Sequence, residues 1–401
     1  MNQRKEFSFD RFFSLRYYAV KKDSILLYRL LFKEHGGENM EWKRFTFIGL
    51  GLIGGSLAKA IKKAYPDSHI SVLDKDEHSI QIALAEAVVN QDLKSLKEIE
   101  KDTDLLFLCA PVEQNRAFLE ELKTLLSPHT ILSDVGSTKT AIMKEVEELG
   151  LSSRFIGGHP MAGAEVSGYQ ASDSLLLENA YYLLTPGKTF PNELTEKMQS
   201  FLSSIGSIPF VMSPKEHDKS VACVSHLPHL LAASLVKLLK EEDEKGTMKK
   251  LAAGGFKDIS RIASSSPIMW QQICLSNKAP IIDMIEDYIT LLEDIKTSIK
   301  KEEPHAVMEL FQESGEYRNS MDSSAQGLIQ SEYAISLHVQ DHPGAISIIS
   351  TILASNMVSI RNIGINHNRE KGEGALQLSF YTGEDLSLIH ISEPTRLGMI
   401  S

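Results

Sequence analysis

The sequence predicts a parallel α/β domain, followed by an all-α domain and a small α+β domain. Short apolar runs alternate with helical patterns from residue 45 to about residue 212, as is typical of βαβ units. Long amphipathic stretches with few strand candidates follow, and strand-like runs return from Tyr333. We therefore expect domains at residues 40–212, 213–330 and 331–385.

The composition favours a cytoplasmic protein with small-molecule partners. The 401 residues carry a formal net charge of −11, whereas a nucleic-acid surface needs an excess of Lys and Arg. Three cysteines in apolar contexts indicate neither a disulfide framework nor a metal cluster. Because no apolar run approaches the roughly 18–20 residues of a membrane span, we expect no membrane partner.

The two ends of the chain do not fit the domain pattern. Gly36-Gly-Glu-Asn precedes Met40 and resembles an in-frame translation of a ribosome-binding site, so we expect residues 1–39 to be a non-native extension. The alternative is a genuine N-terminal arm. Residues 386–401 begin with "LSLIHISEPTR", which resembles a translated sequencing adapter, and we expect an adapter-derived tail there.

Seven strands are expected in the first domain, and two long helices dominate the second. The strands are Phe45–Ile48, Ile70–Leu73, Leu105–Cys109, Ile131–Leu132, Phe155–Ile156, Tyr181–Leu184 and Ile208–Val211. The helices are Leu227–Lys240 and Ile281–Lys301, whose apolar faces suit either a subunit interface or a monomeric bundle. The third domain is expected to read strand, helix, strand, strand.

A glycine motif follows the first strand and indicates a Rossmann-type nucleotide-binding domain. Gly49, Gly51 and Gly54 fit G-x-G-x-x-G, and Asp74 closes the next strand. Asp74 would bind ribose hydroxyls and repel a 2′-phosphate, which favours NAD over NADP, although Lys75 weakens that preference. A glycine-rich helix start without a ligand is the alternative. The expected cofactor-binding residues are Gly49, Gly51, Leu52, Ile53, Gly54, Asp74, Ala110 and Pro111.

Two polar residues follow later strand runs. Ser137 in "DVGSTK" and His159 in "FIGGHPMAGAE" would lie near the nicotinamide, because ligands of open α/β sheets bind at the carboxyl ends of strands. Two alternatives remain: Ser137 or Thr138 caps the next helix, and His159 is a turn residue whose neighbouring glycines and Pro160 shape the turn.

The helical domain contributes further candidates. His226 and His229 lie three residues apart on one helix face and could bind substrate, bind a metal or simply pack at a helix start. Substrate contact is favoured, because no further ligand motif accompanies them. Arg261 could grip a carboxylate in bidentate fashion or pair with Asp258.

Six motifs in this order resemble prephenate dehydrogenases of the tyrosine pathway over roughly residues 43–325. They are "GLGLIGGSLA", "DVGSTK", "GGHPMAGAE", "ENAYYLLTP", "EHD" with "VSHLPH", and "GGFKDISRIASSSPIMW". From Tyr333 the sequence resembles an ACT domain, a βαββαβ module that senses amino acids. Ala164 stands where many relatives have serine, which removes a hydroxyl but no catalytic group.

The resemblance implies oxidative decarboxylation of prephenate with reduction of NAD⁺, in a homodimer. His159 matches the catalytic histidine, which accepts a hydrogen bond from the substrate hydroxyl, and Ser137 matches a serine that binds this hydroxyl and orients the histidine. Arg261 matches the residue that binds a substrate carboxylate, and Glu165 matches an acidic residue at the mouth of the pocket. The expected substrate-binding residues are Ser225, His226, His229, Asp258, Arg261, Trp270 and Glu165.

The ACT-like segment stops after its third strand, near Tyr381, where the adapter-like tail follows. Because an unpaired sheet edge is unfavourable, we expect a loosely ordered module and loss of feedback inhibition by L-tyrosine. Two other functions remain open: an arogenate dehydrogenase, whose substrate differs only in the side chain, and an NAD- and amino-acid-sensing regulator.

Overall fold

A computed structural model describes residues 42–163, 166–321, 334–340, 344–358, 360–368 and 373–380. The chain forms two compact units. One is Gly37–Leu328, and the other combines Met1–Gly36 with Ile329–Ser401. The expected N-terminal extension and adapter-derived tail lie outside the described residues. The prediction that the ACT-like segment lacks its last helix and strand also concerns residues outside them.

An eight-stranded sheet forms the first part of the larger unit, in the order β3-β2-β1-β4-β5-β6-β7-β8. All neighbouring strands pair in parallel except β6 and β7, which are antiparallel. The strands are β1 Arg44–Ile48, β2 His69–Leu73, β3 Gln91–Asp92, β4 Leu105–Leu108, β5 Ile131–Asp134, β6 Phe155–Pro160, β7 Tyr181–Pro186 and β8 Ile208–Val211. The seven predicted strands are confirmed, and only β3 is additional because two residues are too short for a periodic pattern.

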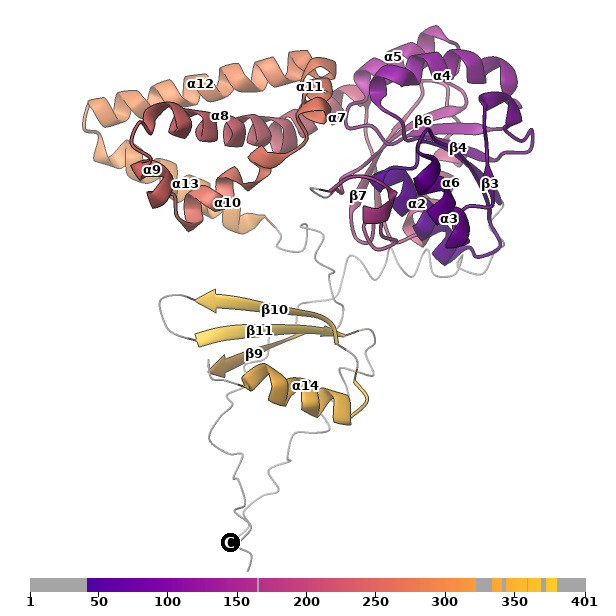
Figure 1. Cartoon of the computed structure of the whole chain (residues 1–401). Helices are drawn as coiled ribbons and strands as arrows, with labels where there is room; N and C mark the ends of the chain where they lie inside the picture. The colour runs from indigo at the N-terminus through magenta and orange to yellow at the C-terminus, as the bar shows by residue number, and fades with distance from the viewer. Residues whose placement is uncertain are drawn as a thin grey trace, which may run out of the picture. The chain divides into compact units, whose positions relative to one another are not determined.

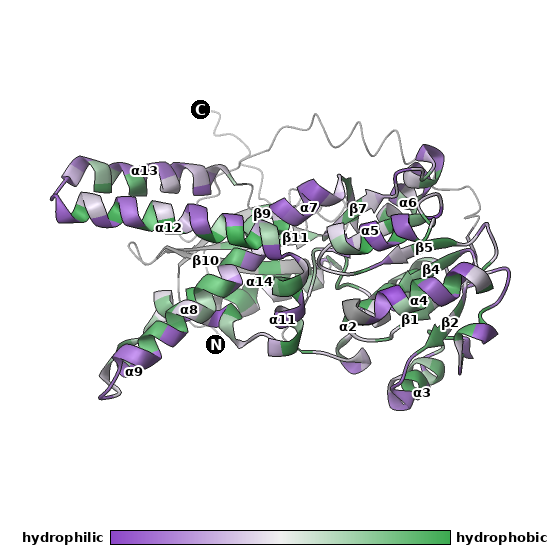
Figure 2. Ribbon diagram, turned by 90° about the horizontal axis from the view of Figure 1, so that it is seen from above, coloured by the Kyte–Doolittle hydropathy of each residue, from purple (hydrophilic) through white to green (hydrophobic). Residues whose placement is uncertain are grey.

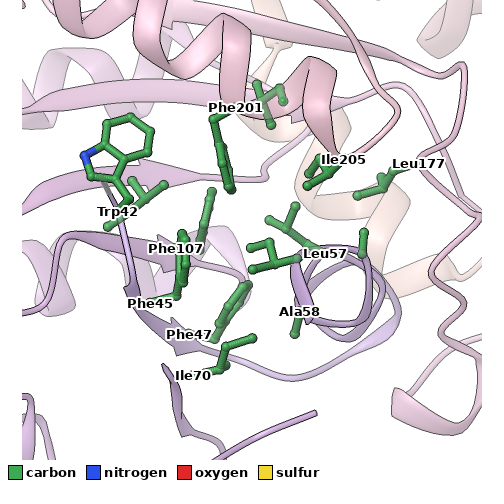
Figure 3. Close-up of a cluster of buried hydrophobic side chains, with 14 of the residues drawn as sticks. Trp42, Phe45, Phe47, Leu57, Ala58, Ile70, Phe107, Leu177, Phe201 and Ile205 are labelled. Carbon is green, nitrogen blue, oxygen red and sulfur yellow. The ribbon is translucent and has the colours of Figure 1, made fainter. Parts of the chain in front are cut away.

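Helices cover both faces of this sheet, as the near-continuous apolar strands require. They are α2 Leu52–Ala64, α3 Glu77–Ala85, α4 Val112–Leu125, α5 Thr140–Glu148 and α6 Asn192–Ser204. Figure 1 shows α4 and α5 on one side and α2, α3 and α6 on the other. Under α2 and α6, the rings of Phe45 and Phe201 stack with centroids 5.6 Å apart in the buried cluster of Figure 3. This rigid sheet fixes the ends of β1, β5 and β6, where the site lies.

The second part of the larger unit is helical, as predicted. It contains α7 Pro214–Val221, the π-helical turn η3 Ala222–His226, α8 Leu227–Glu242, α9 Thr247–Leu251, α10 Gly254–Ser260, η4 Arg261–Ser264, α11 Pro267–Ser276, α12 Lys278–Lys300 and α13 Pro304–Ser320. Hydrophobic and hydrophilic residues alternate along α8 and α12 (Figure 2). Apolar side chains such as Leu238 and Ile289 are more than half exposed.

The continuous helical run Pro214–Glu242 is long and apolar enough to cross a membrane, with a mean hydropathy of 1.4 over its best window. The prediction that no apolar run approaches the length of a membrane span is therefore wrong by this criterion. Length and composition alone are weak evidence, because a core helix of a globular protein has the same properties. Within this run, the polar side chains of His217, Asp218 and His226 are buried and hydrogen-bonded, which a lipid-facing helix would not explain.

The described part of the smaller unit is a three-stranded antiparallel sheet in the order β10-β11-β9 with one helix. Its elements are β9 Ala334–Gln340, α14 Ala345–Ser355, β10 Ile360–Asn368 and β11 Glu373–Phe380. Ile349 and Leu353 of α14 pack on Leu376 and Leu378 of β11. The predicted succession of strand, helix, strand and strand is confirmed.

Candidate active site

The loop between β1 and α2 needs two of its glycines for steric reasons and leaves space at the third. Gly49 has a φ of +100°, and a Cβ there would lie 2.7 Å from the backbone carbonyl of Cys109. A Cβ on Gly54 would lie 2.5 Å from the carbonyl oxygen of Gly49. A Cβ on Gly51 would meet no atom within 4 Å. The open position is therefore the one where a pyrophosphate could approach the backbone.

Helix α2 begins at Leu52, so that Leu52 and Ile53 form its first turn. Gly51 occupies the N-cap position and supplies no side-chain hydrogen bond. The N–H groups of the first turn thus suit an anion, since a helix start combines unsatisfied donors with a partial positive charge.

Asp74 lies at the end of β2 beside this loop. Its carboxylate accepts hydrogen bonds from the backbone N–H groups of Leu50 and Asp76, the latter at 2.8 Å. Ala110 and Pro111 follow β4, with Ala110 half-buried and Pro111 exposed. The predicted cofactor-binding residues therefore surround one loop at the carboxyl ends of β1, β2 and β4, and the residues present fit a dinucleotide.

His159 lies inside strand β6, where it pairs with Leu183 of β7, and is not a turn residue. The neighbouring glycines allow close packing and do not shape a turn. A Cβ on Gly158 would lie 2.5 Å from the carbonyl oxygen of Asp134, and one on Gly157 would clash with the hydroxyl of Thr185. The predicted turn at Pro160 is therefore wrong, because the chain stays extended and hydrogen-bonded through this residue.

The buried carboxylate of Asp134 binds the backbone just before Ser137 and just before His159. Asp134 accepts hydrogen bonds from the N–H of Gly136 at 2.9 Å and from the N–H of Gly158 at 3.1 Å. It also forms an ion pair with Lys139, and both side chains are fully buried. Burial lowers the pKa of Lys139, and the Asp134 charge opposes that shift. The Ser137 loop and strand β6 are thus fixed to each other.

Neither Ser137 nor Thr138 caps helix α5, so this alternative is wrong. The cap comes from Asp218 on α7, whose Oδ1 accepts from the Lys139 N–H at 2.7 Å and whose Oδ2 accepts from the Thr140 N–H at 2.8 Å. The Thr138 hydroxyl donates instead to Ser276 at 3.0 Å. Ser137 is half-buried, and its hydroxyl is not needed for capping.

A chain of three buried side chains ends at His159. Its Nδ1 lies 2.8 Å from Nε2 of His217, and Nδ1 of His217 lies 2.8 Å from Oδ1 of Asp218. Burial, followed by the neighbouring His217, Lys139 and His226, holds the pKa of His159 well below its usual 6.5. His217 and Asp218 both lie in the quoted "EHD" motif, but no role for either was predicted from the sequence.

The pair His226 and His229 contacts Trp270, as their spacing on one helix face allows. His229 stacks on the indole ring at a centroid distance of 3.9 Å, and His226 meets it edge-on at 5.9 Å. Nδ1 of His226 accepts from Asn277 Nδ2 at 3.1 Å, and Nδ1 of His229 donates to the carbonyl oxygen of Ser225 at 2.9 Å. Burial lowers the pKa of His226 to about 4.

Arg261 and Asp258 lie on the exposed side of this cluster. Arg261 begins η4, which packs against α8, and its charge adds to burial in lowering the pKa of His229. Asp258 is exposed on α10, and its alternative pairing with Arg261 stays a prediction. Glu165 lies outside the described residues.

Two further findings concern ligands. Among the described residues, no group of three or more His, Cys, Asp and Glu side chains is placed to hold a metal ion. A hollow of about 290 Å³ is lined by Met161, Tyr181, Leu183, Phe210, Met212, Ser220, Val221 and Val224. Its lining is almost entirely apolar and includes none of the predicted site residues, so it does not match a charged substrate.

The arrangement combines a dinucleotide-type loop, a buried neutral imidazole and a histidine cluster beside an arginine. A neutral imidazole can accept a proton, and an arginine can bind a carboxylate. The site therefore suits hydride and proton removal from a small anionic molecule that carries a hydroxyl group.

Comparison with known proteins agrees with this chemistry. A family model described as the nucleotide-binding domain of prephenate dehydrogenase matches residues 57–211. A second model, described as the dimerization domain of prephenate dehydrogenase, matches residues 213–313. Together they cover every strand of the sheet except β1 and most of the helical part.

Individual relatives and solved structures give the same result. The chain is 39% identical over 341 residues to a prephenate dehydrogenase of Bacillus subtilis, covering 84% of this chain and 92% of the relative. A crystal structure of prephenate dehydrogenase from A. aeolicus with hydroxyphenyl propionate and NAD⁺ is 31% identical with a TM-score of 0.67, covering 71% of this chain and 100% of that one. A crystal structure of Synechocystis arogenate dehydrogenase is 29% identical with a TM-score of 0.62, covering 69% and 99%.

Proposed function

The chain belongs to the prephenate dehydrogenase family, and on this premise we propose how its residues carry out the family's reaction. It is an NAD-dependent oxidoreductase that converts prephenate to 4-hydroxyphenylpyruvate and carbon dioxide, a step toward L-tyrosine. The observation that carries the assignment of roles is the buried, neutral His159, held beside the Ser137 loop by Asp134.

The reaction removes a hydride from the ring carbon that bears the 4-hydroxyl group. Bound NAD⁺ supplies the acceptor for this hydride. The bond to the ring carboxylate breaks as carbon dioxide leaves, and its electron pair makes the ring aromatic. The hydroxyl oxygen ends as a phenol, so the proton shared with a base during the reaction returns to the product. The site needs a group that can hold this proton for a short time.

His159 is proposed to hold this proton. Positive charge develops at the carbon that bears the hydroxyl group, so an acceptor on the hydroxyl stabilises the transition state. A neutral imidazole can do this, and its low pKa keeps it neutral at physiological pH. Ser137 is proposed to bind the same hydroxyl, because its side chain does not cap α5. Gly49, Gly51, Gly54 and Asp74 are proposed to bind the dinucleotide.

The substrate carries two carboxylates, which need cationic or hydrogen-bonding partners. Arg261 is proposed to bind one of them, and His226, His229 and Ser225 to line the pocket beside Trp270. Burial and, to a smaller extent, the charge of Arg261 lower the pKa of His229, which supports one shared pocket. Glu165 is proposed to restrict access at its mouth, and Asp258 is proposed to lie near the pocket or to be contributed across the dimer interface.

Titration with prephenate and NAD⁺, followed by NADH absorbance, tests the function. The wild type should reduce NAD⁺, and His159→Asn should lower kcat by about 10²–10⁴-fold, the usual contribution of acid–base catalysis. A His159→Asn variant with near-normal kcat would remove His159 from the mechanism. Arogenate should be assayed in parallel, because the similarity to an arogenate dehydrogenase structure makes this substrate the second candidate. No turnover of either substrate would favour a sensor.

A homodimer is proposed through the helical domain, which matches the family's dimerization domain. Exposed apolar residues on its helices support this, among them Leu238, Ile289, Leu291 and Leu292. The protein is also proposed to be cytoplasmic, since its cysteines Cys109, Cys223 and Cys274 are all free.

The smaller unit is proposed to be an ACT-like module with L-tyrosine as its effector. The order of β9, α14, β10 and β11 supports the assignment, since it equals the first four elements of a βαββαβ module. Prephenate turnover at increasing L-tyrosine tests it. Turnover that falls as L-tyrosine increases supports the assignment, whereas unchanged turnover agrees with the predicted loss of feedback inhibition.

A further inference from the structure

We infer that His217, held by Asp218, is a positioning residue that fixes His159 in the tautomer with the proton on Nδ1. Nε2 of His159 is then left as the hydrogen-bond acceptor for the substrate hydroxyl. This inference rests on the proposed role of His159. It also concerns a property of the free protein, namely the position of one proton, which can be measured without substrate.

The first step concerns Asp218, which is 1% exposed. Burial alone would raise the pKa of this carboxyl group, but hydrogen bonds from His217, Thr140 and Lys139 lower it. Asp218 is therefore ionised at neutral pH, and an ionised carboxylate only accepts hydrogen bonds. The 2.8 Å contact between its Oδ1 and Nδ1 of His217 requires the proton to sit on Nδ1.

The second step follows from the two nitrogens of an imidazole ring. A neutral His217 with its proton on Nδ1 has an unprotonated Nε2, which can only accept. The 2.8 Å contact between this Nε2 and Nδ1 of His159 then requires the proton on Nδ1 of His159. Neutral His159 consequently has a free lone pair on Nε2. Reversing either hydrogen bond would place two acceptors or two N–H groups against each other.

The third step concerns the rigidity of the chain of contacts. His217 is fully buried, and Asp218 also caps α5 through two backbone N–H groups. The carbonyl oxygen of Asp218 accepts from Asn277 Nδ2 at 2.8 Å. Asp218 therefore cannot turn away without breaking contacts to α5, and Asn277 fixes its backbone. These contacts restrict rotation of the His217 ring, which then holds the His159 ring.

Three titratable groups surround His159: His217 on α7, Lys139 at the N-cap of α5 and His226 in η3. Asp134 pairs with Lys139, and Asp218 pairs with His217. His217, Lys139 and His226 each disfavour a cationic His159, in addition to burial. His159 therefore stays neutral, and its tautomer is what the His217 ring sets.

Two substitutions separate positioning from a general effect on packing. His217→Leu removes the acceptor, so His159 can adopt either tautomer, and kcat should fall by about tenfold as the productive tautomer becomes the minor one, with little change in KM for prephenate. In His217→Gln, the side-chain amide oxygen can accept from Nδ1 of His159, and most of kcat should return.

Ser213→Ala is the matched control. It removes the capping box of α7 and weakens the same helix without touching the His217 ring. It should lower the melting temperature while kcat and the pH profile stay near wild type. If Ser213→Ala lowered kcat as much as His217→Leu at equal loss of stability, His217 would have a structural role only.

NMR of the imidazole nitrogens in isotope-labelled, substrate-free protein gives the direct readout. Wild-type His159 should show a protonated Nδ1 and an unprotonated Nε2, and His217→Leu should show a mixture. A wild-type spectrum with the proton on Nε2 would overturn the inference even if the variants failed to fold. Because this spectrum needs no turnover, it tests the inference separately from the proposed function. The inference can fail while the enzyme is active, and the expected tautomer can be present in a protein that does not turn over prephenate.

Discussion

Lys139 and Asp134 form an ion pair that is buried from solvent on both sides. Asp134 also accepts the backbone N–H groups of Gly136 and Gly158, each of which precedes a proposed active-site residue. The ion pair therefore neutralises the carboxylate that aligns Ser137 with His159. Its contribution is best seen by removing one partner, because this leaves the other charge buried and unpaired.

Lys139→Met should lower the free energy of unfolding by about 3–5 kcal/mol, the usual result of breaking a buried ion pair from one side. Chemical denaturation measures this value. The double variant Asp134→Asn with Lys139→Met should recover part of the loss, because no uncompensated charge remains. If the loss of unfolding free energy in the double variant equalled the sum of the losses in both single variants, the broken ion pair would not explain the destabilisation.

Substitutions of two glycines in the β1–α2 loop should have different effects, one on folding and the other on cofactor binding. Gly49→Ala should destabilise the protein, because its Cβ would meet backbone at 2.7 Å and its φ is +100°. Gly51→Ala should fold normally, because no atom lies within 4 Å of the new Cβ, but should raise KM for NAD⁺ by blocking the approach of the pyrophosphate. Thermal unfolding and NAD⁺ titration distinguish the two. A normal KM in Gly51→Ala would contradict the proposed binding mode.

The sequence predicted the sheet well because its strands are buried on both faces and read as continuous apolar runs. Gly49, Gly54 and Asp74 were placed correctly, since strand, turn and helix follow each other at fixed spacing. The position of His159 inside a strand could not be predicted from such a spacing. Two glycines before it are typical of a turn, and only the close approach of Asp134 and Thr185 shows that they are needed for packing. His217 was missed because its partners lie 58 residues away in β6 and beside it on α7.

Protonation of His226 should make the protein less stable in acid. Burial lowers its pKa to about 4 in the folded chain, from an ordinary value of 6.5. Between these two values the unfolded chain binds more protons, so the free energy of unfolding is highest above pH 6.5 and falls as the pH drops toward about 4. Urea unfolding at a series of pH values measures the slope.

His226→Gln should have a smaller slope in this range than the wild type, whereas His129→Gln, a change at an exposed histidine, should leave the slope unchanged. His159 contributes in the same direction, because its pKa is also lowered. An equal slope in the wild type and in His226→Gln would show that His226 is not the group whose protonation costs stability.

The exposed apolar residues of α12 give a test of the proposed homodimer. Ile289, Leu291 and Leu292 are about half exposed in the single chain, and these positions carry no polar group that would favour solvent. Leu291→Glu together with Leu292→Glu should convert a dimer to a monomer, because burying two carboxylates without partners in an interface is unfavourable. Light scattering or sedimentation measures the mass.

Lys300→Glu near the end of the same helix is the control, since it also adds negative charge to α12 but replaces a residue that is already charged. A dimer that survives the double change while the control also stays dimeric would place the interface on another face of the helical domain.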